Sequence, residues 1–431
     1  MPKLVSAVVC FFVFIIITCG AQTAISADSI SGFPLKIGLL ADSQITTYNG
    51  SRVALYRSKT IDAFVNVAIR PPALEELSPQ MLKYALDQLY NEKVDVILYL
   101  GDGANSGGED ELNVLFSTLR GSRHNHNSVP IFMVIGNHDY LGVGNTSNMV
   151  VRRRLINRPG KPKNKPLTKY DVVTRISAFN HESTLLANKN LTSGCFAYRD
   201  NFDSLLALKN HNNGLYLAGL VGYTEQNRPA VEIFLADTSD YMYATKPRVP
   251  NSVEGYGAKG SISSSNHISN DDNTQMTCLK RFSDEAGSKA EYRIIAAHYP
   301  LQDLHMFYKG DWWNTYIKKN LLSWTLNNGN NYWVSGHTHI DMGKVVDTMK
   351  PYKVGPNNES RFDCINIGST TDKHAHVAVL GRKDKEYVEF PGNGGLFYKI
   401  IPMFDPAANE SLYSDIKKDI EAIRKGSQAH S

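Results

Sequence analysis

Short apolar runs alternate with stretches of helical spacing along this chain, and together they predict an α/β protein. Apolar residues recur at the spacing of a helix over 78–92 and 109–120. The apolar runs have the length of buried strands, and they lie at 35–41, 94–100, 130–135, 231–237, 292–297, 331–335 and 364–367. The alternation of strand and helix indicates an α/β sheet. The run at 231–237 is expected to enter this same sheet.

Five of the predicted strands end in residues that can bind a metal ion. These endings are Asp42-Ser43-Gln44, Gly101-Asp102, Gly136-Asn137-His138-Asp139, His298 and Gly336-His337-Thr338-His339. In an open α/β sheet, sites form outside the carboxyl ends of the strands, so residues far apart in the sequence meet in one crevice. One histidine at a strand end is more often structural, whereas five such endings in one chain predict a functional site.

The order of these motifs resembles the signature of the calcineurin-like metallophosphoesterases. That signature is Asp-x-His, Gly-Asp, Gly-Asn-His-Asp/Glu, a single His and Gly-His-x-His. The resemblance spans roughly residues 35–382, and four of the five blocks match fully. It implies a four-layer α/β/β/α sandwich, in which two sheets are flanked by helices. Residues at about 140–230 are too long and irregular for a plain connection, and they are expected to be an irregular insertion that shapes the pocket.

The resemblance also implies a metal-binding role for seven of the motif residues. One metal ion would be bound by Asp42, Gln44 and His339, a second by Asn137, His298 and His337, and both by the bridging Asp102. Two cations about 3.5–4 Å apart clamp the attacking and leaving oxygens of a phosphoryl transfer, and they lower the pKa of water to about 7. Mixed imidazole and oxygen ligands suit Mn, Fe, Zn or Co rather than Ca.

Two further motif residues are expected to act beside the metal ions. By the same resemblance, His138 would protonate the leaving oxygen without binding a metal, and Asp139 would orient His138. Phosphomonoesters or phosphodiesters would then be hydrolysed by metal-activated hydroxide.

Gln44 departs from the family pattern, which has a histidine at this position. Its amide oxygen is a harder and weaker ligand than imidazole, so we expect looser binding at the first metal and a shift toward Mn or Mg. A glutamine here is similar to that of Mn-dependent ADP-ribose or CDP-alcohol diphosphatases, which makes a nucleotide diphosphatase the alternative activity. A catalytically weak phosphate- or metal-binding protein is the alternative from another class.

Asn105 stands where purple acid phosphatases have a metal-binding tyrosine, which excludes that branch.

Composition and charge limit the possible partners. The net charge is +4 and charged residues make up 20% of the chain, a balance too mild to argue for nucleic acid or for a membrane surface. The family resemblance implies a phosphate-ester small molecule or another phosphorylated substrate as the partner. A basic stretch over 152–169 would be either a solvated loop or a cationic lip that attracts an anionic substrate. His374 and His376 are expected at the surface.

The N-terminus predicts export. Lys3, an apolar run over 4–19 and small residues up to Ala27 are typical of a signal peptide over residues 1–27. The run is shorter than the roughly 20 residues of a bilayer span, so a secreted or periplasmic protein without a stable span is favoured over a membrane anchor. The enzyme domain is expected over 35–400 and a helical tail over 401–431. One disulfide is possible among Cys195, Cys278 and Cys364, and the sequence does not choose the pair.

Overall fold

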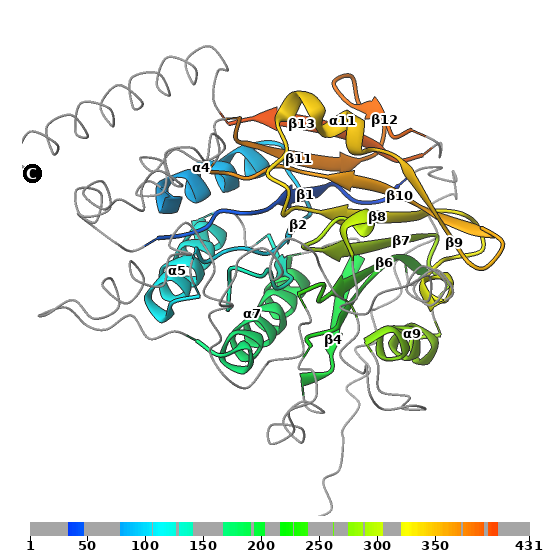
Figure 1. Cartoon of the computed structure of the whole chain (residues 1–431), viewed down its shortest axis with the longest axis horizontal. Coiled ribbons are helices and arrows are strands. Elements are labelled where there is room, and N and C mark those ends of the chain that lie inside the picture. The colour runs from blue at the N-terminus through cyan, green and yellow to red at the C-terminus, as the bar shows by residue number, and fades with distance from the viewer. Residues whose placement is uncertain are drawn as a thin grey trace, which may run out of the picture. The chain divides into compact units, whose positions relative to one another are not determined.

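The description of the fold rests on a computed structural model of the chain (Figure 1). The structure describes residues 33–46, 78–105, 107–125, 129–140, 167–190, 194–202, 216–226, 228–239, 262, 275–287, 289–304, 320–371, 374–391 and 395–403. The signal peptide predicted at 1–27 lies outside these ranges. So does the helical tail predicted at 401–431, apart from residues 401–403, of which the first two end a strand.

The described strands form two mixed sheets. The first is a 6-stranded sheet in the order β12-β13-β11-β1-β2-β3. Its strands are β1 (Ile37–Leu40), β2 (Val96–Tyr99), β3 (Ile131–Met133), β11 (His376–Gly381), β12 (Val388–Glu389) and β13 (Phe397–Pro402). Strands β1, β2 and β3 run parallel, whereas β11 pairs antiparallel with β1.

The second is a 7-stranded sheet in the order β4-β5-β6-β7-β8-β10-β9. Its strands are β4 (Gly194–Asp200), β5 (Gly219–Glu225), β6 (Arg228–Ala236), β7 (Tyr292–Ala297), β8 (Asn331–Ser335), β9 (Pro351–Val354) and β10 (Ser360–Asn366). Strands β6, β7, β8 and β10 run parallel. The predicted strand at 231–237 therefore lies in a different sheet from β1, β2 and β3, so the expectation that it enters their sheet is wrong.

Alternate residues of the central strands pack into two different hydrophobic cores. In β2, Val96 and Leu98 belong to a cluster that joins side chains of both sheets, whereas Ile97 and Tyr99 belong to a cluster that includes the helices. Successive side chains of a strand point to opposite faces. The two sheets thus pack face to face with helices outside them, which confirms the predicted α/β/β/α sandwich.

The helices cover the outer faces of the sheets (Figure 1). Helices α4 (Ser78–Asn91) and α5 (Glu109–Asn125) contact each other, α4 also contacts β11, and α9 (Gln275–Glu285) contacts β5. The predicted helices at 78–92 and 109–120 correspond to α4 and α5. The short elements η1 (Leu301–Asp303), η2 (Met342–Lys344) and α11 (Val345–Thr348) complete the helical part. None of the helices in the described ranges combines the length and apolar composition needed to cross a membrane.

The segment at about 140–230 is not irregular where the structure describes it. Helix α7 (Lys169–Asn190) contacts both β3 and β4, and β4 and β5 extend the second sheet. The sequence hides this helix because its buried face includes the polar residues Ser177, Asn180 and Ser183. Asn180 hydrogen-bonds the backbone of Met133, and Ser183 donates to the carbonyl of Ile131. These bonds attach α7 to β3 in addition to the buried apolar residues Val172, Val173, Ile176 and Phe179.

The three cysteines outside the predicted signal peptide are free in this structure. Cys195 is exposed, whereas Cys278 and Cys364 are buried.

Lys169, the last residue of the predicted basic stretch, is buried rather than solvated. Its Nζ lies 2.8 Å from Oδ2 of Asp237, and both side chains are fully buried. The same ammonium donates to the carbonyl oxygen of Ser239 at 2.9 Å. The pair attaches the start of α7 to the loop after β6. The rest of the basic stretch is outside the described residues, except for Leu167 and Thr168.

We predict that Lys169→Met lowers the free energy of unfolding by about 3–5 kcal/mol, because the Asp237 carboxylate stays buried without its countercharge. Burial raises the pKa of Asp237, and Lys169 opposes that rise. Without Lys169 the folded-state pKa lies further above the unfolded one. The variant should therefore be least destabilised at acid pH and lose stability as the pH rises through that raised pKa. Urea unfolding at several pH values measures this.

Lys280→Met is the matched control. Lys280 forms an ion pair with Asp284 in which the side chains are 41% and 60% exposed, and such pairs contribute about 1 kcal/mol or less. Equal losses for the two variants would contradict the structural role assigned to Lys169.

Candidate metal centre

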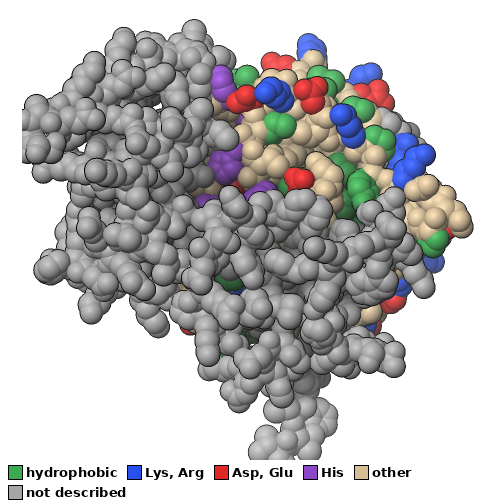
Figure 2. All heavy atoms as spheres, in the orientation of Figure 1, with side chains coloured by type: hydrophobic (Ala, Val, Ile, Leu, Met, Phe, Trp, Pro, Cys, Tyr) green, Lys and Arg blue, Asp and Glu red, His purple; other side chains and the backbone are tan. Residues whose placement is uncertain are grey.

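Loops from both sheets bring the predicted site residues together. Asp42 and Gln44 follow β1, Asp102 follows β2, and the Asn137-His138-Asp139 motif follows β3. The second sheet contributes His298, directly after β7, and His337 and His339, after β8. The site therefore lies where the carboxyl ends of parallel strands from two sheets meet. In the view of Figure 2, histidine side chains gather along one part of the described surface.

Backbone strain concentrates at this site. Eight non-glycine residues of the described ranges have positive φ angles, and five of them are predicted metal ligands. These five are Asp42 (φ 53°), Gln44 (φ 42°), Asp102 (φ 55°), His337 (φ 71°) and His339 (φ 50°). Such conformations cost about 1–3 kcal/mol each and persist only where the surrounding structure enforces them. The strain turns each side chain from the end of its strand toward a common centre.

Two glycines of the motifs are required by close packing. A Cβ on Gly336 would lie 2.5 Å from Oδ2 of Asp42, and a Cβ on Gly136 would overlap the Asp102 carboxylate. In each case the glycine lets the backbone of one motif approach the carboxylate of another. The glycines of the Gly-Asn-His-Asp and Gly-His-Thr-His motifs thus set the spacing of the site.

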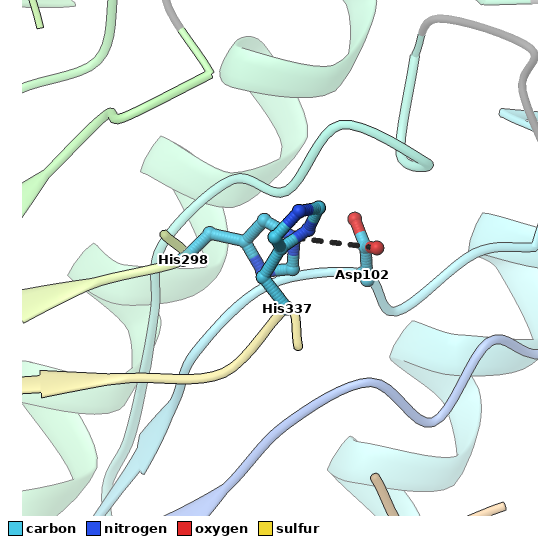
Figure 3. Close-up of side chains that lie close together, drawn as sticks. All are labelled: Asp102, His298 and His337. Carbon is cyan, nitrogen blue, oxygen red and sulfur yellow. Dashed lines mark hydrogen bonds and ion pairs between the residues drawn. The ribbon is translucent and has the colours of Figure 1, made fainter. Parts of the chain in front are cut away.

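Asp102, His298 and His337 form the centre of the cluster (Figure 3). One ligand atom from each lies within 4.8 Å of the other two. Nε2 of His298 lies 3.3 Å from Oδ2 of Asp102 and 3.2 Å from Nδ1 of His337. Asn137 joins them, with its Oδ1 3.1 Å from Nε2 of His298. Carboxylate, amide and imidazole atoms therefore converge on one buried point.

A second group of ligand atoms lies beside this centre. Nε2 of His339 lies 3.4 Å from Oδ1 of Asp42 and 3.2 Å from Nε2 of Gln44. Gln44 also reaches Asp102, with 3.5 Å from Nε2 to Oδ2. Asp102 is the residue that contacts both groups, which is the position expected of a bridging ligand.

Two buried oxygens of the second group make no hydrogen bond within the described part of the chain. They are Oδ1 of Asp42 and Oε1 of Gln44, and both residues are fully buried. An unsatisfied buried acceptor costs about 1–3 kcal/mol. A divalent cation between Oδ1 of Asp42 and Nε2 of His339, which lie 3.4 Å apart, would satisfy that carboxylate oxygen, so this pair fits a metal ion.

His298 is oriented by backbone contacts that the sequence did not reveal. Its Nδ1 lies 2.8 Å from the carbonyl oxygen of Leu100, which leaves Nε2 directed to the cluster. Oγ1 of Thr238 accepts hydrogen bonds from the amides of His298 and Tyr299 at 3.1 and 3.0 Å. Thr238 follows the apolar run at 231–237, so its place after a predicted strand was the one signal available in the sequence.

Mutual electrostatics holds the central groups in defined protonation states. Burial alone would raise the pKa of Asp102, but His298 and His138 hold it well below its usual value. Burial lowers the pKa of His298, yet Asp102 raises it to about 9. Burial and the neighbouring His298 lower the pKa of His337 to about 3. The cluster thus holds an ionised Asp102 and a neutral His337, the forms that bind metal ions, whereas His298 would have to lose its proton when a cation binds.

The carboxylate of Asp139, which was expected to orient His138, is bound by backbone amides. It accepts hydrogen bonds from the backbone amides of Asp102, Ala104 and Gly136 at 3.2, 2.9 and 2.8 Å. Burial and the charge of Asp102 raise the pKa of Asp139 to about 7. Asp139 therefore holds the loops after β2 and β3 together. Buried backbone amides need hydrogen-bond acceptors, and the Asp139 carboxylate is the acceptor for these three.

The His138 ring is oriented by a backbone carbonyl. Its Nδ1 lies 2.8 Å from the carbonyl oxygen of Asn105, and its Nε2 lies 3.8 Å from Oδ2 of Asp102. The side chain is 17% exposed, compared with 1% for Asp102. Nε2 thus faces the edge of the buried cluster.

His376 is fully buried, which corrects the expectation of a surface position. Its Nε2 accepts a hydrogen bond from the amide of Gly368 at 2.9 Å, and its Nδ1 lies 2.9 Å from the carbonyl oxygen of His374. Both ring nitrogens therefore bind backbone atoms, which indicates a structural role for this histidine.

The family model for calcineurin-like phosphoesterases matches residues 36–341, well over half of the chain. The chain belongs to the calcineurin-like phosphoesterase family. This confirms the predicted resemblance over the matched residues, and it makes the protein a metal-dependent phosphoric ester hydrolase. A comparison with curated protein sequences gave no significant match.

Two solved structures are similar to this calcineurin-like phosphoesterase at low sequence identity. A dimetal phosphatase from Danio rerio is 13% identical with a TM-score of 0.40, covering 86% of this chain and 99% of its own. The calcineurin-like phosphoesterase YfkN from Bacillus subtilis is 10% identical with a TM-score of 0.33, covering 90% of this chain and 98% of its own. These similarities are too low to indicate a shared substrate.

We predict that Gly336→Ala lowers kcat/KM about 100-fold, because the added Cβ displaces Asp42 and a shift of about 1 Å at a site costs that much. Metal content and steady-state rates measure the effect, and circular dichroism checks that the fold is retained. Gly343→Ala is the control, since a Cβ there would meet no atom within 4 Å. A fully active Gly336→Ala enzyme would show that this close approach is dispensable.

Proposed function

We propose that the protein is an exported, dinuclear metallophosphoesterase that hydrolyses phosphomonoesters or phosphodiesters. One observation carries the dinuclear site: buried carboxylate, amide and imidazole atoms form two adjoining groups that share Asp102. Asn137, His298 and His337 would hold one cation, and Asp42, Gln44 and His339 the other.

Divalent cations held here would stabilise negative charge on the phosphoryl group and lower the pKa of water. The residues of the chain supply the remaining functions. Asp102 would offset the repulsion between two cations, because it contacts both groups of proposed ligands. His298 keeps Nε2 available because its Nδ1 is occupied by Leu100.

His138 is the proposed general acid. The hydrogen bond of its Nδ1 to Asn105 fixes the ring, so that Nε2 is the nitrogen that donates a proton to the leaving oxygen. Asp102, 3.8 Å from that nitrogen, would stabilise the protonated ring. The His138 side chain is partly exposed, so an incoming substrate could reach it.

Export rests on the N-terminal pattern of Lys3, the apolar run over 4–19 and the small residues after it. The mature N-terminus, determined by mass spectrometry, tests this proposal: an intact Met1 in the exported fraction would refute cleavage.

A nucleotide diphosphatase activity of the ADP-ribose or CDP-alcohol type is the second candidate, because Gln44 places an amide oxygen where the family pattern has imidazole. Turnover of p-nitrophenyl phosphate, bis-p-nitrophenyl phosphate and ADP-ribose with Mn, Mg and Zn distinguishes the activities. Turnover of none of them with any metal would favour a phosphate-binding protein instead.

We predict that Asp102→Asn lowers kcat/KM by at least about 100-fold and reduces the bound metal below two ions per chain. Even residues that only orient metal ligands cost about 10–100-fold, and Asp102 is proposed as a ligand of both ions. Rates and elemental analysis of the purified protein measure this. Asp384→Asn is the matched control, because Asp384 is 54% exposed and pairs only loosely with Lys36 at 3.7 Å. Full metal content in Asp102→Asn would refute the bridging role.

We predict that His138→Ala slows hydrolysis of alkyl phosphates by about 10²–10⁴-fold and that of p-nitrophenyl phosphate far less, because p-nitrophenolate leaves without protonation. Steady-state rates on both ester classes at fixed metal concentration give the ratio. His181→Ala is the control, as His181 is 53% exposed on α7. An equal loss on both classes would exclude His138 as the general acid.

A further inference from the structure

The loop 368–371 contacts the backbone of Asp42, one of the proposed metal ligands. It lies beyond the residues that the family model matches. We propose that this loop, braced by His376, is a positioning device that holds Asp42 in its strained conformation and so sets the affinity for the cation at Asp42 and His339. The inference rests on the proposed dinuclear function and assigns roles to Ser369, Thr371 and His376 that the motifs do not contain.

The backbone of Asp42 is fixed on both sides of its strained φ angle of 53°. Its amide donates to the carbonyl oxygen of Gly101 at 3.0 Å. Its carbonyl oxygen accepts hydrogen bonds from Oγ of Ser369 at 2.7 Å and Oγ1 of Thr371 at 3.3 Å. A non-glycine residue leaves the left-handed region readily unless its backbone is held, and the two hydroxyls supply that restraint.

The restraint determines which carboxylate oxygen is available. Oδ2 of Asp42 accepts a hydrogen bond from the amide of His337 at 2.9 Å. Oδ1 makes no hydrogen bond within the described residues and lies 3.4 Å from Nε2 of His339. Fixing the Asp42 backbone therefore leaves Oδ1 directed toward the neighbouring imidazole, where a shared cation would bind.

The same loop also contacts the strand end that carries His339. A Cβ on Gly368 would overlap the carbonyl oxygen of Ile340, the residue after His339, and the ring of His376. The amide of Thr370 donates to the carbonyl oxygen of Ala41 at 3.3 Å. The loop thus lies against both segments that supply the ligands of this one cation.

The loop is itself held rigidly. The hydroxyls of Ser369 and Thr371 lie 3.0 Å apart, and the amide of Thr371 donates to Oγ of Ser369 at 3.0 Å. His376, at the start of β11, accepts a hydrogen bond from the Gly368 amide. Because β11 pairs with β1, the brace and the strand that leads to Asp42 belong to the same sheet.

Mn²⁺ titration of the metal-free, full-length protein by isothermal calorimetry tests the proposal. The wild-type protein is expected to bind two ions. Ser369→Ala should weaken one of the two binding events about tenfold, and Ser369→Ala combined with Thr371→Val about 100-fold, the range known for residues that orient metal ligands. The other binding event should stay within about twofold of wild type.

Two substitutions serve as controls. Thr371→Ser keeps the hydroxyl and should bind Mn²⁺ like wild type, whereas Thr371→Val alone should weaken one event. Thr370→Val is isosteric at the adjacent buried position, where Oγ1 makes no hydrogen bond within the described residues, and its binding should be unchanged. Raising Mn²⁺ should restore kcat in Ser369→Ala while KM for the substrate stays within about twofold, a recovery that a general loss of folding would not give.

Wild-type affinity for both ions in the folded Ser369→Ala and Thr371→Val proteins would overturn the proposal. Equal weakening of both binding events would also overturn it, since the loop contacts the ligands of one cation alone. If the double variant does not fold, the near-isosteric Thr371→Val decides by itself. A wild-type protein that binds no stoichiometric metal would instead refute the dinuclear function on which the inference rests.

Discussion

The structure depends on the attraction between buried carboxylates and imidazoles at the meeting point of two sheets. Asp102 lies 3.3 Å from His298 and is almost fully buried, a position that a carboxylate tolerates only with partners. The same attraction raises the pKa of His298 and lowers that of Asp102. Strained backbone at five proposed ligand positions is the cost of bringing these groups together, and the surrounding hydrogen bonds offset it.

The strands were predictable because strands buried on both faces are continuous apolar runs. β7 and β8 match their predicted bounds, and every residue in them is buried. A continuous apolar run does not indicate which strands lie beside it, so the sequence did not show which sheet each strand joins. Helix α7 was missed for the opposite reason: Asn180 and Ser183 use polar side chains to bind β3, so the apolar periodicity is broken.

The motif residues were predictable because each follows a strand end, and the structure brings all seven proposed ligands into two adjoining groups. The residues that hold these motif residues in place could not be predicted from the sequence. Leu100 and Asn105 act through backbone carbonyls, which every residue has, and Ser369 acts through a hydroxyl that is common in loops. The resemblance assigned Asp139 to His138, whereas the structure shows its carboxylate accepting hydrogen bonds from backbone amides of neighbouring loops.

The two proposed cation positions differ in chemistry, and Gln44 enlarges the difference. One position has two imidazoles, His298 and His337, whereas the other has only His339 beside the oxygens of Asp42 and Gln44. Imidazole suits Zn, Cu and Fe, while carboxylate and amide oxygens suit Mg and Mn, so the two positions should prefer different ions. An oxygen-rich site binds through geometry more than through ligand strength. Such a site depends on how firmly its oxygens are held, and the hydrogen bonds of loop 368–371 to the Asp42 carbonyl supply that restraint.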